Sequence, residues 1–380
     1  MISRRDLLKT SVALLAGGLI GYVAGNYVPA TYRESLASKE LRVYNWQAYL
    51  NKEIVLPLFM GVIYNEKRLI VNTIYDEYNS AEEAYNKLSL GGYFYDVYNL
   101  GTEVIYKAIK NKLIIRLDHN KIPNLKELDP FIRESLKIQY PENIDLLDYG
   151  VPYMWGTTGI VYNKKKLGTE ITSLKQLFDT DFLTKYSKRI FIIDDPITTV
   201  MVTLIYLGKD FRDPRSYTEE SLREVYNVLS KIVPHVVFLT TDQLIQELVR
   251  ESVYAGIAWN GDALQAIAQK EDLVYIVPEE GSDMWIDMWS IAHNSKEKDL
   301  SYDWINFTLD PWVAALNTTA IWYANPVPAS NEYIPEKILG DPAVYPDNET
   351  KKRLKLFRPL TEEETNNILR VVWAPLTGKT

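Results

Sequence analysis

The sequence of 380 residues contains no cysteine, which excludes disulfide bonds, thiol catalysis, iron–sulfur clusters and cysteine-based zinc sites. Histidine is scarce as well: His119, His235 and His293 are far apart and form no HExxH pair, which argues against a histidine-rich metal site. Basic residues are not in excess, because the formal net charge is -8, whereas a nucleic-acid-binding protein would show a basic footprint. We therefore expect no metal, no cofactor and no nucleic-acid partner.

The chain also lacks a hydrophobic run long enough to cross a bilayer. Its most apolar stretch, residues 11–25, has about 15 residues, whereas a membrane-spanning helix needs about 20. This stretch follows Arg4-Arg5 near the N-terminus, in a pattern that matches the twin-arginine export signal. Residues 1–30 are predicted to be such a signal, either cleaved after Ala30 or retained as an anchor. The mature protein is expected in the periplasm or at the outer face of the cytoplasmic membrane.

Aromatic residues with a polar tip are abundant. The chain has 27 Tyr and 9 Trp against 10 Phe. Because Tyr and Trp combine a flat apolar face with a hydrogen-bonding group, they suit the walls of a ligand cage; a tyrosine-rich core of a thermophilic protein is the alternative. With 47% hydrophobic and 24% charged residues, the chain is long enough for two or three globular domains.

Short strands alternate with helices along most of the chain. Strands are predicted at residues 41–45, 69–75, 94–100, 189–193 and 253–259, with a longer extended stretch at 149–162. Helices are predicted between them, at residues such as 80–88, 103–110, 218–232 and 262–269. This alternation is typical of parallel sheets and of the α/β class. We expect two α/β lobes, with a ligand site beyond the carboxyl ends of the strands.

The residues next to these strand ends combine aromatic rings with carboxylates. They include Trp46, Tyr49, Asp195, Trp259, Asp262, Trp285 and Asp287, with no lysine, arginine or histidine among them. An aromatic face attracts an ammonium group by about 0.5–2 kcal/mol, and a buried ammonium needs a carboxylate partner. An anion site would instead show Arg, Lys or a glycine-rich phosphate loop, and no GxGxxG or Walker A pattern is present. The pattern predicts a site for a cation.

Some of these residues have a second, purely structural interpretation. A tryptophan that follows a strand, such as Trp259, more often belongs to the core than to a ligand wall. One of the pair Asp194 and Asp195 is expected to cap the helix that follows them. Asp287 is harder to explain structurally, because a carboxylate flanked by two tryptophans and a methionine needs a partner.

Several blocks of the sequence match one family in order and spacing. They are Val43-Tyr44-Asn45-Trp46 with Tyr49, Tyr95-Asp96-Val97, Val151-Pro152-Tyr153-Met154-Trp155-Gly156-Thr157-Thr158, Ile257-Ala258-Trp259-Asn260-Gly261, Pro278-Glu279-Glu280-Gly281, Trp285-Ile286-Asp287 and Tyr345-Pro346-Asp347. In these blocks the chain resembles the periplasmic polyamine-binding proteins, the substrate receptors of spermidine/putrescine ABC importers. The resemblance implies a monomeric receptor, not an enzyme, that binds a small cationic polyamine and delivers it to the permease subunits of an ABC transporter.

The resemblance also implies a fold. Family members have the two-lobe periplasmic-binding-protein (Venus-flytrap) fold, type II-like, in which hinge crossovers join two α/β lobes that close on the ligand. Lobe 1 is expected to hold residues 40–162 and 286–331, and lobe 2 residues 163–285 and 332–380. The chain is expected to cross between lobes near Asn163, Trp285 and Pro326.

By the same resemblance, nine residues of this chain are ligand-binding. They are Trp46, Tyr49, Glu103, Asp195, Trp259, Asp262, Trp285, Asp287 and Tyr323. The aromatic residues are expected to line the cleft or to stack on the methylene chain of the ligand, and the acidic residues to hold its ammonium groups.

The chain departs from the family at several of its acidic positions. Spermidine and putrescine receptors usually carry acids where this chain has Ala48 and near Thr198, whereas Glu103 stands where the family has a tyrosine. Asp262 stands where putrescine receptors carry a further acid, and Asp287 matches the main ammonium-binding acid. With these two secure anions, the chain is expected to prefer a short diamine to spermidine.

Two other classes of function remain open. A receptor for a sugar, an aminophosphonate or a metal chelate would also need a cleft, although a sugar site should show more Asn, Gln and Arg, and a phosphonate site more Arg, Ser and Thr. An exported glycoside hydrolase would use two carboxylates. Against an enzyme, no GxSxG motif, histidine-based triad or metal signature is present.

Overall fold

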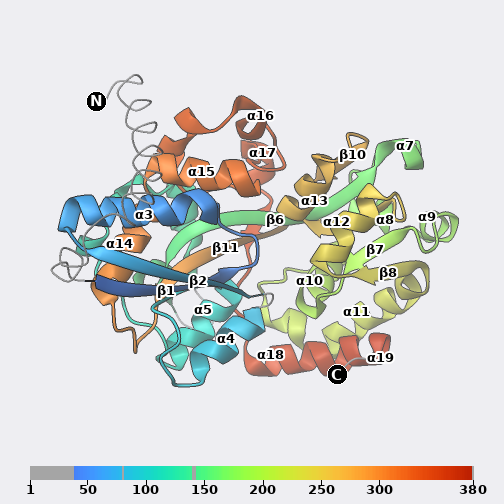
Figure 1. Ribbon diagram of the computed structural model, residues 1–380. Coiled ribbons are helices and arrows are strands. Elements are labelled where there is room, and N and C mark those ends of the chain that lie inside the picture. The colour runs from blue at the N-terminus through green and yellow to red at the C-terminus, as the bar shows by residue number, and fades with distance from the viewer. Residues whose placement is uncertain (1–37, 79–80, 139–142, 379–380) are drawn as a thin grey trace.

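The structure of the protein is a computed structural model that describes residues 38–78, 81–138 and 143–378. Two α/β lobes lie side by side and are joined by long strands (Figure 1). The predicted export signal, residues 1–30, lies outside the described ranges. Within those ranges no helix is both long enough and apolar enough to span a membrane.

One ten-stranded sheet runs through both lobes. Its main path is, in order, β2 (Ile70–Tyr78), β1 (Ser38–Trp46), β3 (Val97–Gly101), β11 (Ser282–Ile291), β6 (Val151–Asn163), β9 (Ala255–Trp259), β7 (Ile190–Ile193) and β8 (Val236–Leu239). Off this path, β10 (Leu273–Ile276) pairs with β6 and β12 (Leu354–Leu356) pairs with β11. A separate ribbon joins β4 (Lys137–Ile138) to β5 (Ile144–Asp145).

Helices cover the sheet in both lobes (Figure 1). Around β1, β2 and β3 lie α3 (Lys52–Lys67), α4 (Ala81–Ser89), α5 (Thr102–Lys110), α14 (Lys298–Thr308) and α15 (Pro311–Ile321). Helix α6 (Pro130–Ser135) contacts β4. Around β7, β8 and β9 lie α7 (Lys164–Leu167), α8 (Leu174–Leu177), α9 (Thr180–Lys185), α10 (Pro196–Tyr206), α11 (Glu219–Ile232), α12 (Thr241–Val249), α13 (Asn260–Ile267), α18 (Glu362–Asn367) and α19 (Ala374–Thr377). The C-terminal stretch also forms α16 (Glu336–Leu339) and α17 (Asn348–Lys351).

Helix α11 illustrates how the sequence pattern positions these helices. Leu222, Val225, Leu229 and Ile232 recur at helical spacing and are all buried, so one face of the helix packs on the second lobe's core. The side chain of Thr218 accepts a hydrogen bond from a backbone N–H of the first turn and caps the helix. The helix predicted at residues 218–232 is thereby confirmed.

Strand β6 carries the chain from one lobe to the other. All of its residues are buried. Residues 151–157 pair antiparallel with β11, and residues 158–162 pair antiparallel with β9, so the partner changes between Thr157 and Thr158. The expectation of parallel sheets holds for β1 with β2 and β3, and for β7 with β8 and β9. In the large sheet, the antiparallel pairs all involve β6 or β11.

The mixed sheet has a topological cause. A strand that returns from one lobe to the other enters the second sheet from its far end, and it therefore runs against the local strand direction.

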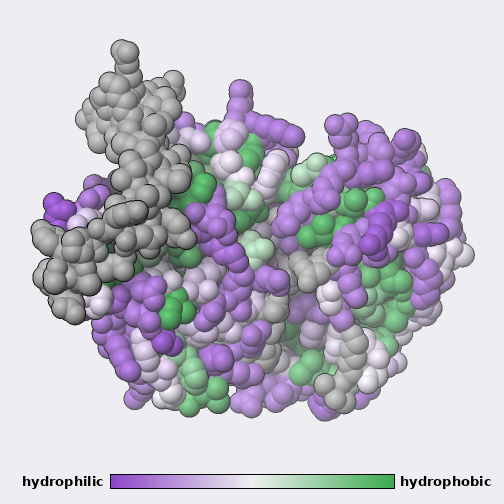
Figure 2. All heavy atoms as spheres, viewed as in Figure 1, coloured by the Kyte–Doolittle hydropathy of each residue, from purple (hydrophilic) through white to green (hydrophobic). Residues whose placement is uncertain are grey.

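Figure 2 shows a mostly hydrophilic face whose outline is indented between the two lobes. The limits expected for the lobes, residues 40–162 with 286–331 and residues 163–285 with 332–380, stay a prediction.

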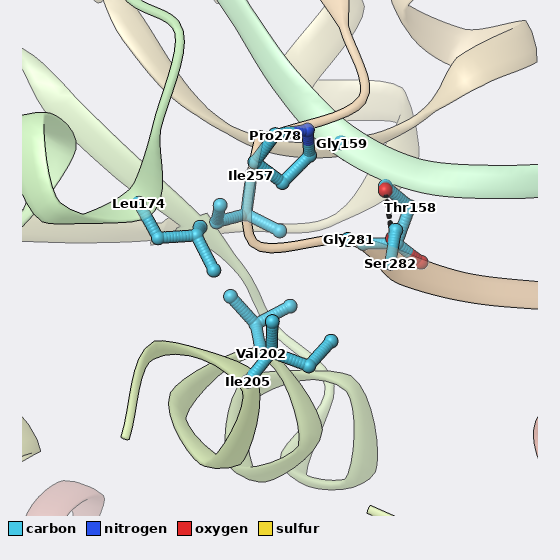
Figure 3. A pocket seen from close by; sticks show the side chains of 9 residues that line it. All are labelled: Thr158, Gly159, Leu174, Val202, Ile205, Ile257, Pro278, Gly281 and Ser282. Carbon is cyan, nitrogen blue, oxygen red and sulfur yellow. Dashed lines mark hydrogen bonds between the residues drawn. The ribbon is translucent and has the colours of Figure 1, made fainter. Parts of the chain in front are cut away.

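A carboxylate is buried where β6 and β11 meet. The Ser282 hydroxyl donates to the Thr158 carbonyl (Figure 3) and lies 3.2 Å from Oδ1 of Asp283, a residue that is 4% exposed. The crevice beside this seam is lined mainly by aliphatic residues such as Val202 and Ile205 (Figure 3). Burial raises the pKa of Asp283 to about 6, although hydrogen bonds from Thr158 and Ser282 act in the opposite direction.

This raised pKa predicts a pH-dependent stability. Asp283 binds its proton more tightly in the folded chain than in the unfolded chain, so its ionisation destabilises the fold as the pH rises from about 4 to about 6. The free energy of unfolding of Asp283→Asn, relative to the natural chain, should increase by about 2 kcal/mol between pH 4 and pH 7. Urea unfolding at both pH values measures this difference. A constant difference between the two chains would contradict the assignment.

Candidate functional site

The loop after β1 places Tyr49 in an aromatic cluster. Its ring packs edge-on against Tyr153 and Tyr323, with centroid distances of 5.6 and 5.3 Å. Its backbone carbonyl accepts hydrogen bonds from the Tyr153 hydroxyl at 2.8 Å and from Nδ2 of Asn45 at 3.3 Å. The loop is therefore held at its backbone, and Tyr49 is fixed in place.

Strand β11 places Asp287 among these tyrosines. Asp287 is 7% exposed and lies opposite Gly101, the last residue of β3, next to an irregularity in the pairing with β6. The pKa values of Tyr49, Tyr153 and Tyr323 are all raised well above their usual range. Burial is the main cause in each case, and the negative charge of Asp287 contributes to all three. Three tyrosines are thus close enough to one buried carboxylate to be affected by its charge.

A second carboxylate reaches the same cluster from the other lobe. Asp262 is 5% exposed and stands in the first turn of α13, just after β9. After burial, Asp262 and then Asp287 are the largest causes of the raised pKa of Tyr323. The Tyr323 ring lies directly against Gly261, where a Cβ atom would overlap it. Tyr323 therefore lies near both carboxylates and packs against α13.

Trp285 extends the aromatic cluster. Its ring meets Tyr323 edge-on at a centroid distance of 5.2 Å, and it covers Gly156 of β6, where a Cβ atom would overlap the indole. Two glycines, Gly156 and Gly261, therefore allow two aromatic rings to approach the backbone closely. Trp285 itself is only partly buried.

The other four expected residues have positions or contacts of their own. Trp46 ends β1 and packs against Tyr78 with a centroid distance of 4.6 Å. Trp259 is the one partly exposed residue of β9. Asp195 caps α10, because Oδ1 accepts a hydrogen bond of 2.6 Å from the N–H of Thr198; the expected cap by one of the two aspartates is confirmed. Glu103 belongs to α5, but its side chain lies outside the described part of the chain.

The cluster thus has five members that sequence reasoning had selected. They are Tyr49, Asp262, Trp285, Asp287 and Tyr323. Two carboxylates with aromatic walls can hold an organic cation, because rings cover its apolar parts and carboxylates bind its charges. In the described ranges, no cluster of three or more acidic or histidine side chains is arranged to hold a metal ion.

Residues 70–346 match the family of bacterial extracellular solute-binding proteins. The chain belongs to this family. Among the relatives of this solute-binding protein is the putrescine-binding periplasmic protein SpuD of Pseudomonas aeruginosa, 28% identical over 96% of this chain and 98% of the relative. The spermidine/putrescine-binding periplasmic protein of Salmonella typhimurium is 29% identical over 82% and 84%.

Solved structures agree with this assignment. A putative spermidine/putrescine ABC transporter protein from Listeria monocytogenes superposes with a TM-score of 0.75, at 27% identity, over 89% of this chain and 98% of that one. The substrate-binding protein PotD from Streptococcus pneumoniae gives a TM-score of 0.74 at 27% identity, over 88% and 97%. The predicted two-lobe periplasmic-binding-protein fold is confirmed.

Sequence reasoning missed Asn260 in this solute-binding protein. Its Oδ1 accepts a hydrogen bond of 3.2 Å from the N–H of Thr157, where β6 changes partner, and its Nδ2 donates to the carbonyl of Ala343 at 2.8 Å. Asn260 thus ties α13 to the crossing strand and to the C-terminal stretch. The position between Trp259 and Gly261, next to a strand end, was the signal that could have pointed to it.

Proposed function

We propose that this solute-binding protein is the extracytoplasmic receptor of an ABC importer and that its ligand is a small polyamine. The observation that carries the proposal is that two buried carboxylates, Asp262 and Asp287, both act electrostatically on Tyr323, whose ring packs against Tyr49 and Trp285. Each carboxylate would bind one ammonium group, and Tyr49 and Trp285 would cover the methylene chain between them. The relatives named for putrescine and spermidine support this ligand class.

The chemistry of the cluster favours an amine over the other ligands considered. A sugar site would need amide and guanidinium groups for the hydroxyls, and a phosphonate site would need cationic or N–H donors. The five clustered residues instead supply aromatic faces and negative charge. The family membership favours a receptor over an exported glycoside hydrolase.

The receptor is further proposed to act as an exported monomer. The twin-arginine pattern in residues 1–30 would direct it across the cytoplasmic membrane, cleaved or anchored. Its partners would be the permease subunits of the importer, and the acidic chain would have no nucleic-acid partner. Ligand binding would close the two lobes over the Asp262 and Asp287 carboxylates.

A short diamine is expected to bind more tightly than spermidine. Asp195 is engaged as the cap of α10, and Ala48 offers no charge, so the proposed site has two anions, Asp262 and Asp287. Two ammonium groups match two carboxylates, whereas the additional ammonium of spermidine would need a third partner. Titration calorimetry with putrescine, cadaverine and spermidine measures the order directly. Tighter binding of spermidine would show that a further acid, such as Glu103, takes part.

Trp259 provides a test of the aromatic wall. It is partly exposed at the end of β9, two residues before Gly261, which touches Tyr323. Trp259→Ala should weaken putrescine binding by about 1–2 kcal/mol, because a cation–π and apolar contact is lost. Calorimetric titration of the variant measures the loss. Unchanged affinity would place Trp259 outside the site and favour its interpretation as a structural residue.

A further inference from the structure

A third carboxylate stands beside the loop that follows Trp46 and carries Tyr49. Glu77 lies in β2, in register with Asn45 of β1. Its Oε1 accepts a hydrogen bond of 3.1 Å from the backbone N–H of Ala48. Ala48 has a φ of 53°, the left-handed conformation that a non-glycine residue rarely adopts. Glu77 therefore holds an unusual loop conformation and brings a negative charge to the loop.

The chain supplies its own cation to this carboxylate. Nζ of Lys52, the first residue of α3, lies 3.0 Å from Oε2 of Glu77. The side chains are 45% and 24% exposed, so the pair is open to solvent and to other ions. The ammonium of Lys52 is a primary alkylammonium group, the same group that a polyamine presents at its ends. Lys52 thus occupies Glu77 in the way that a ligand ammonium would.

We propose that Lys52 and Glu77 set the number of ammonium groups that the receptor accepts. This inference rests on the proposed amine-binding function and extends it to the choice between amines. While Lys52 neutralises Glu77, the loop offers no net negative charge to a third ammonium, and the lysine charge repels one. A diamine, which ends at the two carboxylates of the cluster, does not depend on Glu77.

A matched pair on the same helix separates this role from a general surface effect. Lys67, the last residue of α3, forms an ion pair with Asp303, and these side chains are 44% and 23% exposed. The chemistry and exposure of the two pairs are nearly equal, but Lys67 lies at the opposite end of α3 from the loop. Exposed ion pairs of this kind contribute little to stability, so both lysines can be replaced without unfolding the chain.

The test compares the affinities of the full chain for spermidine and putrescine at low ionic strength, where screening is weak. Lys52→Gln frees Glu77 and should raise the spermidine-to-putrescine affinity ratio by about three- to tenfold, as expected for one charge at partial exposure. Glu77→Gln leaves the Lys52 charge uncompensated and should lower the ratio by a similar factor. Lys67→Gln should leave the ratio unchanged, and added salt should reduce both shifts.

The outcomes distinguish this inference from the proposed function. If the natural chain binds no amine, the proposed function itself fails. If it binds putrescine but Lys52→Gln and Glu77→Gln leave the ratio unchanged, the amine receptor stands and the role of this pair is refuted. Equal shifts in Lys52→Gln and Lys67→Gln would also refute it, because the effect would then be one of overall charge.

Discussion

Asp287→Asn should abolish most of the affinity for putrescine, with a loss of about 3–5 kcal/mol in binding free energy. Asp287 is buried, and its charge contributes to the raised pKa of three tyrosines, Tyr49, Tyr153 and Tyr323. An ammonium group bound there is removed from water, so loss of the carboxylate charge leaves a buried cation uncompensated. Titration calorimetry with putrescine at neutral pH measures the effect.

Another aspartate of the same strand provides the control. Asp283 is as deeply buried in β11 as Asp287, but it lies at the seam with Thr158 and not among the clustered tyrosines. Asp283→Asn should therefore retain putrescine binding. Asp262→Asn should weaken binding less than Asp287→Asn, because Asp287 matches the main ammonium-binding acid of the polyamine receptors and Asp262 matches a further one. Loss of binding in Asp262→Asn with normal binding in Asp287→Asn would show that the two carboxylates are ranked wrongly.

Several strands could be predicted from the sequence because they are short apolar runs bounded by turn residues, whereas β8 and β12 were not predicted. The predicted segment 189–193 matches β7 almost residue for residue, and the predicted segment 41–45 lies inside the longer β1. The direction of β6 could not be predicted in this way. Its residues are buried along the whole strand, so its pattern shows no alternation that would reveal the change of partner at Thr157.

The site was predictable in residue type but not in arrangement. Asp262 could be predicted as a ligand-binding residue because it follows a strand, and Asp287 because it is flanked by apolar residues. Both features are local in the sequence. Tyr323 was selected through family resemblance alone, since its contact with Gly261 joins distant segments. The pairing of Glu77 with Lys52 and Ala48 also depends on tertiary structure, because β2 must first lie beside β1.

The C-terminal stretch contains a buried ion pair. Nη1 and Nη2 of Arg358 donate to the two carboxylate oxygens of Glu364 at 2.9 and 2.5 Å, and the side chains are 4% and 9% exposed. Arg358 also donates to the carbonyl of Arg212 at 2.7 Å, which links the segment after β12 to the second lobe. On the other side, the N–H of Phe357 donates to the carbonyl of Met284 in β11. The segment is therefore attached to β11 and to the second lobe.

Glu364→Gln should lower the free energy of unfolding by about 3–5 kcal/mol, because it leaves the buried Arg358 without its negative partner. Urea unfolding followed by tryptophan fluorescence measures the change. The exposed pair of Lys352 and Glu349 provides the control, and Glu349→Gln should have little effect because solvent already screens that pair. The double replacement Arg358→Met with Glu364→Leu should recover most of the stability, since no unpaired charge remains buried. If Glu364→Gln were as stable as the natural chain, water or another group would have to compensate Arg358, and the ion pair would not hold the C-terminal stretch.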